Sequence, residues 1–201
     1  MLRLNQLSKL DAALAYADLA WSVFPVRGHI RGGVPLDNTG GPEGLGSTDP
    51  GQVRRWFEEA NPYTNVAIKT GGLSGLVVIS VSGDKGRDSL KALESKYGPL
   101  PETLTARYPG GLDLYFRSDK AQQIHTYPDS LGPGLHVYGG CLGVIAPPTA
   151  GRKWLNDLEP AVAPPWLVRL MLKPRRWDIE RRAERFADRF ASNWAGRGRA
   201  A

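Results

Sequence analysis

Two serine hydroxyls stand at the end of an apolar predicted strand, residues 77–82. Side chains alternate along a strand, so Ser80 and Ser82 share one face at its C-terminal end. Open α/β sheets commonly carry their chemistry at that end of their strands. Two carboxylates at this spacing would hold divalent cations for phosphoryl or nucleotidyl transfer, whereas two hydroxyls are weak neutral ligands. The strand has the form of an active-site strand without its acids.

The elements that must position this strand are predicted from periodicity and from turn and cap signals. Asp49 is a candidate N-cap with Pro50 at the first helical position, and the stretch 28–48 is a glycine- and proline-rich loop. Helices are predicted over residues 5–20, from 50 to before 61, 86–97 and 165–172. Further strands are predicted over residues 23–26, 103–107, 112–117, 135–138 and 142–145. This order predicts an α+β fold with a ferredoxin-like mixed sheet.

The C-terminal segment differs in composition from the rest, which predicts a main domain over residues 1–172 and a basic amphipathic helix and tail over residues 173–201. Phe186, Phe190 and Trp194 mark one face of that helix, and arginines mark the other. Three interpretations stay open: the apolar face docks on the protein's own core, binds a protein partner, or contacts nucleic acid or a membrane surface.

Charge and cysteine content limit the function classes. The net charge is +6 over 201 residues, but residues 173–201 hold nine basic and four acidic residues, which leaves 17 basic and 16 acidic residues in the main domain. A polymerase-sized positive groove is therefore not evident. The single cysteine, Cys141, excludes an internal disulfide. No apolar run reaches the roughly 20 residues of a membrane span, so we expect a cytoplasmic protein without a membrane partner.

Several blocks occur in a characteristic order and carry a family resemblance: WSVFPV (21–26), NVAIKTGGLSGLVVISVSG (65–83), GGLDLYF (110–116) and GVIAPPT (143–149). Over roughly residues 10–172 the chain resembles the bifunctional DNA primase/polymerase (Prim-Pol) N-terminal domain family of the archaeo-eukaryotic primase superfamily. The resemblance implies an RRM-like sheet with flanking helices, and a template-dependent nucleotidyltransferase that uses Mg²⁺ or Mn²⁺.

The residues that the resemblance singles out are changed in this chain. Ser80 and Ser82 stand where the family carries Asp-x-Asp. Asp113 occupies the His position of the block that helps to hold the phosphates of the incoming nucleotide, and His136 occupies the position of a third metal-binding Asp. The resemblance therefore implies a degenerate active site with no confident catalytic residue and no confident metal ligand.

Alternative roles for these positions stay open. Asp113 and His136 could form a hydrogen-bonded pair without a metal, or could join Asp84 in a replacement transition-metal site. A Ser-His-Asp nucleophile is disfavoured, because neither a strained elbow nor an oxyanion hole is evident.

Four further residues are candidates for nucleotide or phosphate binding: Lys69, Arg107, Gly110 and Gly111. Backbone N–H groups of glycine turns can bind phosphate, and basic side chains beside such turns can assist. The competing interpretation is a solvated lysine at a strand end, an ordinary exposed arginine, and glycines that serve backbone geometry.

The function predicted from these observations is a primase-polymerase-like protein that has lost metal-dependent nucleotidyl transfer. It would act in DNA replication or repair by binding a nucleotide, DNA, RNA or a protein partner, the last through residues 173–201. No cofactor is expected in that case. The alternative is an active DNA primase/polymerase with a non-standard Mg²⁺ or Mn²⁺ site. That alternative requires other metal ligands, because the loss of two acidic ligands by itself leaves little metal affinity.

Overall fold

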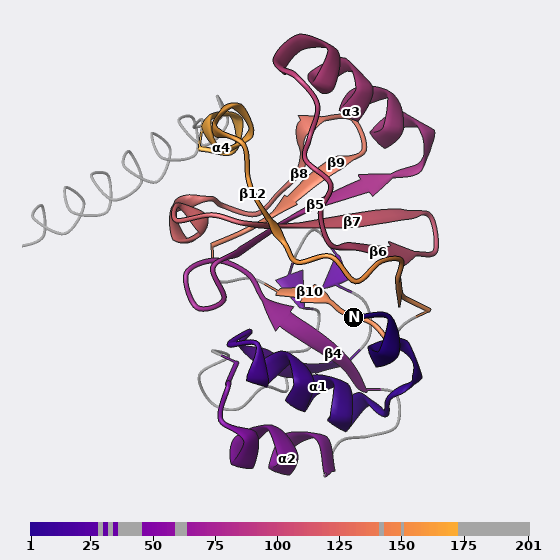
Figure 1. Cartoon of the computed structure of the whole chain (residues 1–201), viewed down its shortest axis with the longest axis vertical. Helices are drawn as coiled ribbons and strands as arrows, with labels where there is room; N and C mark the ends of the chain where they lie inside the picture. The colour runs from indigo at the N-terminus through magenta and orange to yellow at the C-terminus, as the bar shows by residue number, and fades with distance from the viewer. Residues whose placement is uncertain are drawn as a thin grey trace, which may run out of the picture. The chain divides into compact units, whose positions relative to one another are not determined.

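The strand that carries the two serines, β5 (Leu76–Ser82), lies inside a seven-stranded sheet (Figure 1). The computed structural model describes residues 1–27, 30–31, 34–35, 46–58, 64–140, 143–149 and 151–172. The hydrogen-bonded order of the sheet is β11-β6-β7-β5-β9-β8, and β12 runs parallel to β7. The other strands of this sheet are β6 (Thr105–Tyr108), β7 (Gly111–Arg117), β8 (Tyr127–Gly132), β9 (Leu135–Tyr138), β11 (Lys153–Trp154) and β12 (Ala161–Val162).

Four central strands have the order of a ferredoxin-like sheet. Strand β5 leads through helix α3 (Gly83–Tyr97) to β6, and β7 then returns between them, which is a split βαβ unit. β9 completes the order β6-β7-β5-β9, and each adjacent pair is antiparallel. Between β7 and β9 the chain forms the 3₁₀ turn η2 (Ala121–Gln123) and β8 instead of a second long helix. The predicted α+β class is confirmed.

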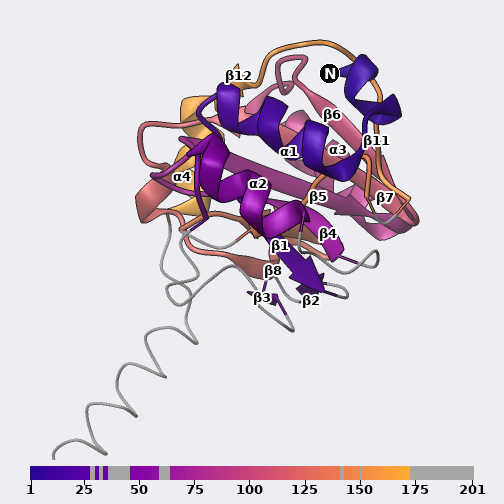
Figure 2. The same ribbon diagram turned by 90° about the horizontal axis from the view of Figure 1, so that it is seen from below.

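A second, three-stranded antiparallel sheet has the order β1-β4-β10. Its strands are β1 (Val23–Arg27), β4 (Thr64–Lys69) and β10 (Gly143–Ile145), and a short hairpin joins β2 (Ile30–Arg31) to β3 (Val34–Pro35). Helices α1 (Lys9–Asp18) and α2 (Pro50–Glu58) pack beside β4 and β1 (Figure 2). Helices α3 and α4 (Pro165–Met171) lie on the opposite side of the larger sheet (Figure 1).

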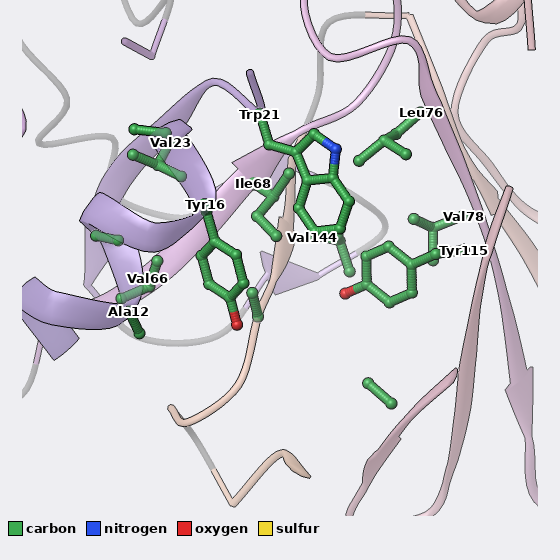
Figure 3. Packing of buried hydrophobic residues seen from close by; sticks show 14 of the residues in the cluster. Ala12, Tyr16, Trp21, Val23, Val66, Ile68, Leu76, Val78, Tyr115 and Val144 are labelled. Atoms are coloured by element: carbon green, nitrogen blue, oxygen red, sulfur yellow. The ribbon is translucent and has the colours of Figure 1, made fainter. Parts of the chain in front are cut away.

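Alternation along β5 divides the core as the sequence predicts. Val77, Ile79 and Val81 pack in the cluster that includes side chains of α3 and α4, whereas Leu76 and Val78 face the second sheet and α1. The cluster that includes Leu76 and Val78 contains a series of contacting aromatic rings, which we call the aromatic ladder (Figure 3). Its contacts join Trp21 to Tyr16 and to Tyr115, and Trp154 to both tyrosines, with ring centroids 4.9–6.5 Å apart. Aromatic contacts at such distances add to the free energy gained by burial.

The helix boundaries show which local sequence signals were sufficient to predict where a helix begins. Asp49 caps α2 as predicted, because its side chain accepts hydrogen bonds from the N–H groups of residues 51 and 52. The helix predicted over residues 5–20 is present but shorter, as α1: a 3₁₀ turn, η1 (Leu2–Gln6), precedes it, and Ser8 caps it by accepting from the N–H of Asp11. Any side chain at Ser8 that cannot accept would leave that N–H without this partner.

Helix α3 begins three residues earlier than predicted. It starts at Gly83, directly after β5, and Gly83 has φ +59° while its N–H donates to the Gly110 carbonyl. Gly86, which looked like the helix start, is buried inside the helix; a Cβ there would lie 2.6 Å from the Gly134 carbonyl oxygen. The glycine thus permits close packing of α3 against the turn between β8 and β9.

Candidate functional site

The register of the larger sheet brings three of the predicted site residues together. Ser80 on β5 is the direct cross-strand neighbour of Asp113 on β7 and of His136 on β9. We call these three residues the polar row. Facing residues on adjacent antiparallel strands have Cβ atoms about 4.5–5.5 Å apart, so their side chains share one environment. Ser82 pairs with Gly111 one step further along the same face.

Tyr108, which the sequence analysis did not single out, joins the two serines. It ends β6 opposite Gly111, and its hydroxyl accepts a hydrogen bond from Ser80 Oγ at 3.0 Å. The same hydroxyl lies 2.6 Å from Ser82 Oγ, a hydrogen bond in which either oxygen could be the donor. The serine hydroxyls are therefore held by a phenol.

Asp113 is the one carboxylate in the polar row, and a second unpredicted residue engages it. Its side chain is only 1% exposed, and its Oδ2 forms an ion pair with Nη1 of Arg152. Oδ1 has no hydrogen-bond partner among the described residues. Burial raises the pKa of Asp113 above its ordinary value, and the Arg152 guanidinium opposes that rise. The carboxylate is thus committed to a cation from within the protein.

Arg152 is fixed from two directions. Beyond the ion pair with Asp113, its guanidinium carbon lies 4.7 Å from the centroid of the Tyr108 ring, a cation–π contact. Its backbone N–H donates to the Thr149 carbonyl at 3.0 Å, which places the residue directly before β11. Tyr108 therefore contacts both serines through its hydroxyl and Arg152 through its ring.

His136 does not form the predicted hydrogen bond with Asp113. Its Nδ1 accepts from the backbone N–H of Asp129 at 3.0 Å, which corresponds to the tautomer with the proton on Nε2. The Asp129 carboxylate lies 3.8 Å from the same nitrogen and also accepts from the Gly134 N–H at 2.6 Å. The interpretation of Asp113 and His136 as a hydrogen-bonded pair is wrong, because each side chain has a different partner.

Two tyrosines on the same sheet face as Asp113 have raised pKa values. Burial first, and then the nearby Asp113 charge, raises the pKa of Tyr138 to about 12. The same two causes raise the pKa of Tyr115, which is fully buried and whose hydroxyl has no hydrogen-bond partner among the described residues. Both phenols therefore stay protonated near neutral pH.

Two of the basic and glycine candidates lie away from the polar row. Lys69 ends β4 in the smaller sheet and is only 7% exposed, with its ammonium 5.4 Å from the centroid of the Phe24 ring. The interpretation of Lys69 as a solvated lysine is therefore wrong. Arg107 is exposed, and strand alternation directs it to the sheet face opposite Tyr108.

Gly110 and Gly111 have local structural reasons to be glycine. Gly110 sits in the β6–β7 turn with φ +104°, a conformation that other residues adopt at a cost. A Cβ on Gly111 would lie 2.1 Å from the Val81 carbonyl oxygen and 2.6 Å from the Tyr108 hydroxyl oxygen. Gly111 therefore permits the approach that brings Tyr108 to the serines.

The donor groups at this site do not fit a pair of divalent cations. Nowhere in the described part of the chain do three His, Cys, Asp or Glu side chains gather as a metal-binding group. Asp84, the third member of the alternative metal set, is exposed and paired with Arg87 at the start of α3. Two-metal transfer needs carboxylates that bridge the ions, and the polar row offers one, already paired with Arg152.

The predicted basic amphipathic helix and tail, residues 173–201, lie outside the described residues, so the three interpretations of their apolar face stay open. Within the residues that are described, no helix has the length and apolar character to span a bilayer.

Comparison with protein-family models gives a match. The family model for the bifunctional DNA primase/polymerase N-terminal domain, Prim-Pol, matches residues 13–166. That range includes β5, the polar row, Tyr108 and Arg152. No curated protein matches the chain.

Proposed function

This chain belongs to the bifunctional DNA primase/polymerase N-terminal family, and from that premise we propose that it is a binding module for nucleotides or nucleic acid in DNA replication or repair. On this proposal it has lost metal-dependent nucleotidyl transfer. One observation supports the proposal above the others: the only carboxylate of the polar row, Asp113, is buried and ion-paired with Arg152.

The chemical reason lies in what nucleotidyl transfer requires. The reaction joins a hydroxyl to a phosphorus atom and expels pyrophosphate, and metal ions stabilise both the attacking and the leaving oxygen. Ser80 and Ser82 offer neutral hydroxyls that already bond to Tyr108. Asp113 is already paired with Arg152, so a metal ion bound at Asp113 would lie close to the guanidinium, and the two positive charges would repel each other.

A second candidate function has one observation in its favour. Asp113 and His136 flank Ser80 in the register of the sheet, so a transition metal could in principle bind between the two outer strands. This candidate is an active polymerase with a non-standard site. Its requirement is that both side chains exchange their present partners, Arg152 and the Asp129 N–H, for the metal.

Primer extension distinguishes the two candidates. The full-length chain is incubated with a primed DNA template, deoxynucleotides and either Mg²⁺ or Mn²⁺, and we expect no extension above the protein-free background. The chain should nevertheless shift the anisotropy of a labelled oligonucleotide or a labelled nucleotide, because the proposal retains binding. Binding to an oligonucleotide would weaken as salt rises.

The contrary result is extension that depends on the polar row. Asp113→Asn would abolish it if the second candidate is correct, whereas Asp119→Asn, which removes an exposed carboxylate outside the row, would leave it intact. Absence of both extension and binding would reject the binding module as well.

A further inference from the structure

Among the described residues, Arg152 is the cation that pairs with the polar row, and its position is held by the buried Asp113 carboxylate and the partly buried Tyr108 ring. Its side chain is 17% exposed, between the Asp113 carboxylate and the Tyr108 ring. A long arginine side chain ordinarily loses rotamer entropy when it captures a ligand. Here the ion pair and the ring contact have already fixed the guanidinium, so that cost is smaller.

The guanidinium keeps donors that the protein does not use. Arginine carries five N–H donors in a planar fork, and Asp113 engages Nη1. No other side-chain hydrogen bond of Arg152 joins it to the described residues. Such a fork matches the geometry of phosphate oxygens, with two parallel N–H···O bonds.

The charge of the site also favours an anion without a metal. Carboxylates at positions 80 and 82 would repel a phosphate group until divalent cations neutralised them. With serines at those positions, Asp113 and Arg152 balance each other and the polar row has no excess negative charge. Ser82 and Tyr108 are partly exposed residues, and their hydroxyls are neutral hydrogen-bonding groups on the tyrosine whose ring contacts the guanidinium and on the serine bonded to it.

We propose that Arg152 is a phosphate-binding residue of this site, that it binds the terminal phosphates of a nucleoside triphosphate, and that it does so without a divalent cation. Asp113 and Tyr108 act as positioning residues that hold the guanidinium in place. This inference rests on the proposed function, because it names the ligand and the binding group of the same site.

A nucleoside triphosphate fits this arrangement better than a nucleic-acid strand does. One recessed guanidinium can grip one clustered group of phosphate oxygens. A strand spreads its phosphates along its length and needs a series of cations to follow them. On the sheet face that carries the polar row, the other basic candidates are absent: Lys69 lies on the smaller sheet and Arg107 on the opposite face.

The test is titration of dATP into the full-length chain in buffer with excess EDTA, followed by calorimetry. We expect saturable binding that is unchanged when EDTA is replaced by Mg²⁺ at equal ionic strength. Arg152→Gln should weaken binding about tenfold or more, since hydrogen bonds to charged phosphate oxygens are lost. Lys153→Gln removes the same charge from the next residue, which is exposed, and should change affinity less than about twofold.

A paired variant keeps the test valid if the single variant folds poorly. Asp113→Asn together with Arg152→Gln removes both charges, so no uncompensated charge is buried, and we expect the variant to fold while the cation is lost. This variant should also lose dATP binding. A single-stranded oligonucleotide added as competitor should displace dATP only weakly.

Three results would overturn the inference. They are binding that requires a divalent cation, unchanged affinity in the folded paired variant, and stronger binding of the oligonucleotide than of dATP. None of them depends on primer extension, so failure of this inference is separable from failure of the proposed function. Extension by the native chain would reject the proposed function even if Arg152 binds phosphate.

Discussion

Two neighbouring rows on one face of the larger sheet have opposite characters. In the first, which we call the core row, Val78 on β5 lies between Tyr115 and Tyr138 and packs with the aromatic ladder. In the polar row, two residues further along the same three strands, Ser80 lies between Asp113 and His136. The rows are about 7 Å apart, because each strand residue rises about 3.3 Å.

The difference shows how a single sheet can separate stability from recognition. The core row gains free energy from apolar burial and needs no special partner. The polar row loses solvation when it is buried, so each of its groups needs a specific partner to offset that cost. For Asp113 that partner is Arg152, which lies 39 residues away in the sequence. Variants in the two rows should therefore fail in different ways.

The largest effect is expected in the core row. Tyr115→Ala should lower the free energy of unfolding by about 4 kcal/mol, because it removes a fully buried ring that contacts Trp21 and Trp154. Tyr115→Phe keeps the ring and deletes a hydroxyl that has no partner among the described residues, so it should change stability by less than about 0.5 kcal/mol. Urea unfolding measures both; a phenylalanine penalty above about 2 kcal/mol would reveal a partner of that hydroxyl.

Next in size is the loss of the cation in the polar row. Arg152→Gln should lower the free energy of unfolding by about 3 kcal/mol at neutral pH, because it leaves a buried carboxylate without its counter-charge. The paired variant Asp113→Asn with Arg152→Gln should cost less than the single one, since no charge then remains buried. Equal penalties for the two variants would show that Arg152 acts by packing alone.

The pH dependence of that penalty follows from the pKa of Asp113, which burial raises in the folded state. The native state then holds its proton to higher pH than the unfolded chain does, so stability falls as pH rises from the ordinary aspartate pKa towards the raised one. Without Arg152 the pKa rises further and this loss extends to higher pH. Unfolding measured at pH 4 and pH 7 should give the smaller Arg152→Gln penalty at pH 4; a larger penalty at pH 4 would contradict the ion pair.

A smaller effect is expected where the turn meets β5. Gly111→Ala should lower the free energy of unfolding by about 2 kcal/mol, because the new Cβ would press on the Val81 carbonyl and on Tyr108. The control is Gly51→Ala in the first turn of α2, where a Cβ would meet only ordinary contacts. That control should be neutral or stabilise by up to about 1 kcal/mol. A neutral result at Gly111 would mean that the β6–β7 turn can move away from β5.

The smallest effect is expected from the phenol that links the serines. Tyr108→Phe should lower the free energy of unfolding by about 1 kcal/mol, because both serine hydroxyls lose that partner while the ring stays under Arg152. Tyr97→Phe, at a more exposed tyrosine that stacks on Trp166, should have almost no effect. Equal effects in thermal unfolding would show that the serine–phenol contacts contribute nothing measurable.

The face of β5 and the hairpin after α3 could be predicted because their signals are local. Alternation along residues 76–82 placed Ser80 and Ser82 on one face, and the hairpin turned at Gly110 and Gly111 follows from strand pattern and turn residues. The register of that hairpin already puts Tyr108 opposite Gly111, so its proximity to Ser82 could have been inferred.

Other parts of the site depend on contacts that no local pattern encodes. Arg152 follows a turn and precedes a two-residue strand, and only the pairing of β11 with β6 brings it to Asp113. The burial of Lys69 depends on the pairing of β4 with β1, which carries Phe24. Strands of two residues such as β12 are too short to show alternation. Gly86 resembles a helix start because the reason for a glycine inside the helix, its close contact with Gly134, lies far away in the sequence.

The polar row holds its own cation, Arg152, and we propose that it does so instead of binding divalent metal ions. Its most direct test is calorimetric titration of Mn²⁺ alone into the full-length chain, with Asp113→Asn and Asp119→Asn as matched variants inside and outside the row. We expect no saturable Mn²⁺ binding that differs between the native chain and Asp113→Asn. A stoichiometric Mn²⁺ site that Asp113→Asn abolishes and Asp119→Asn preserves would contradict it.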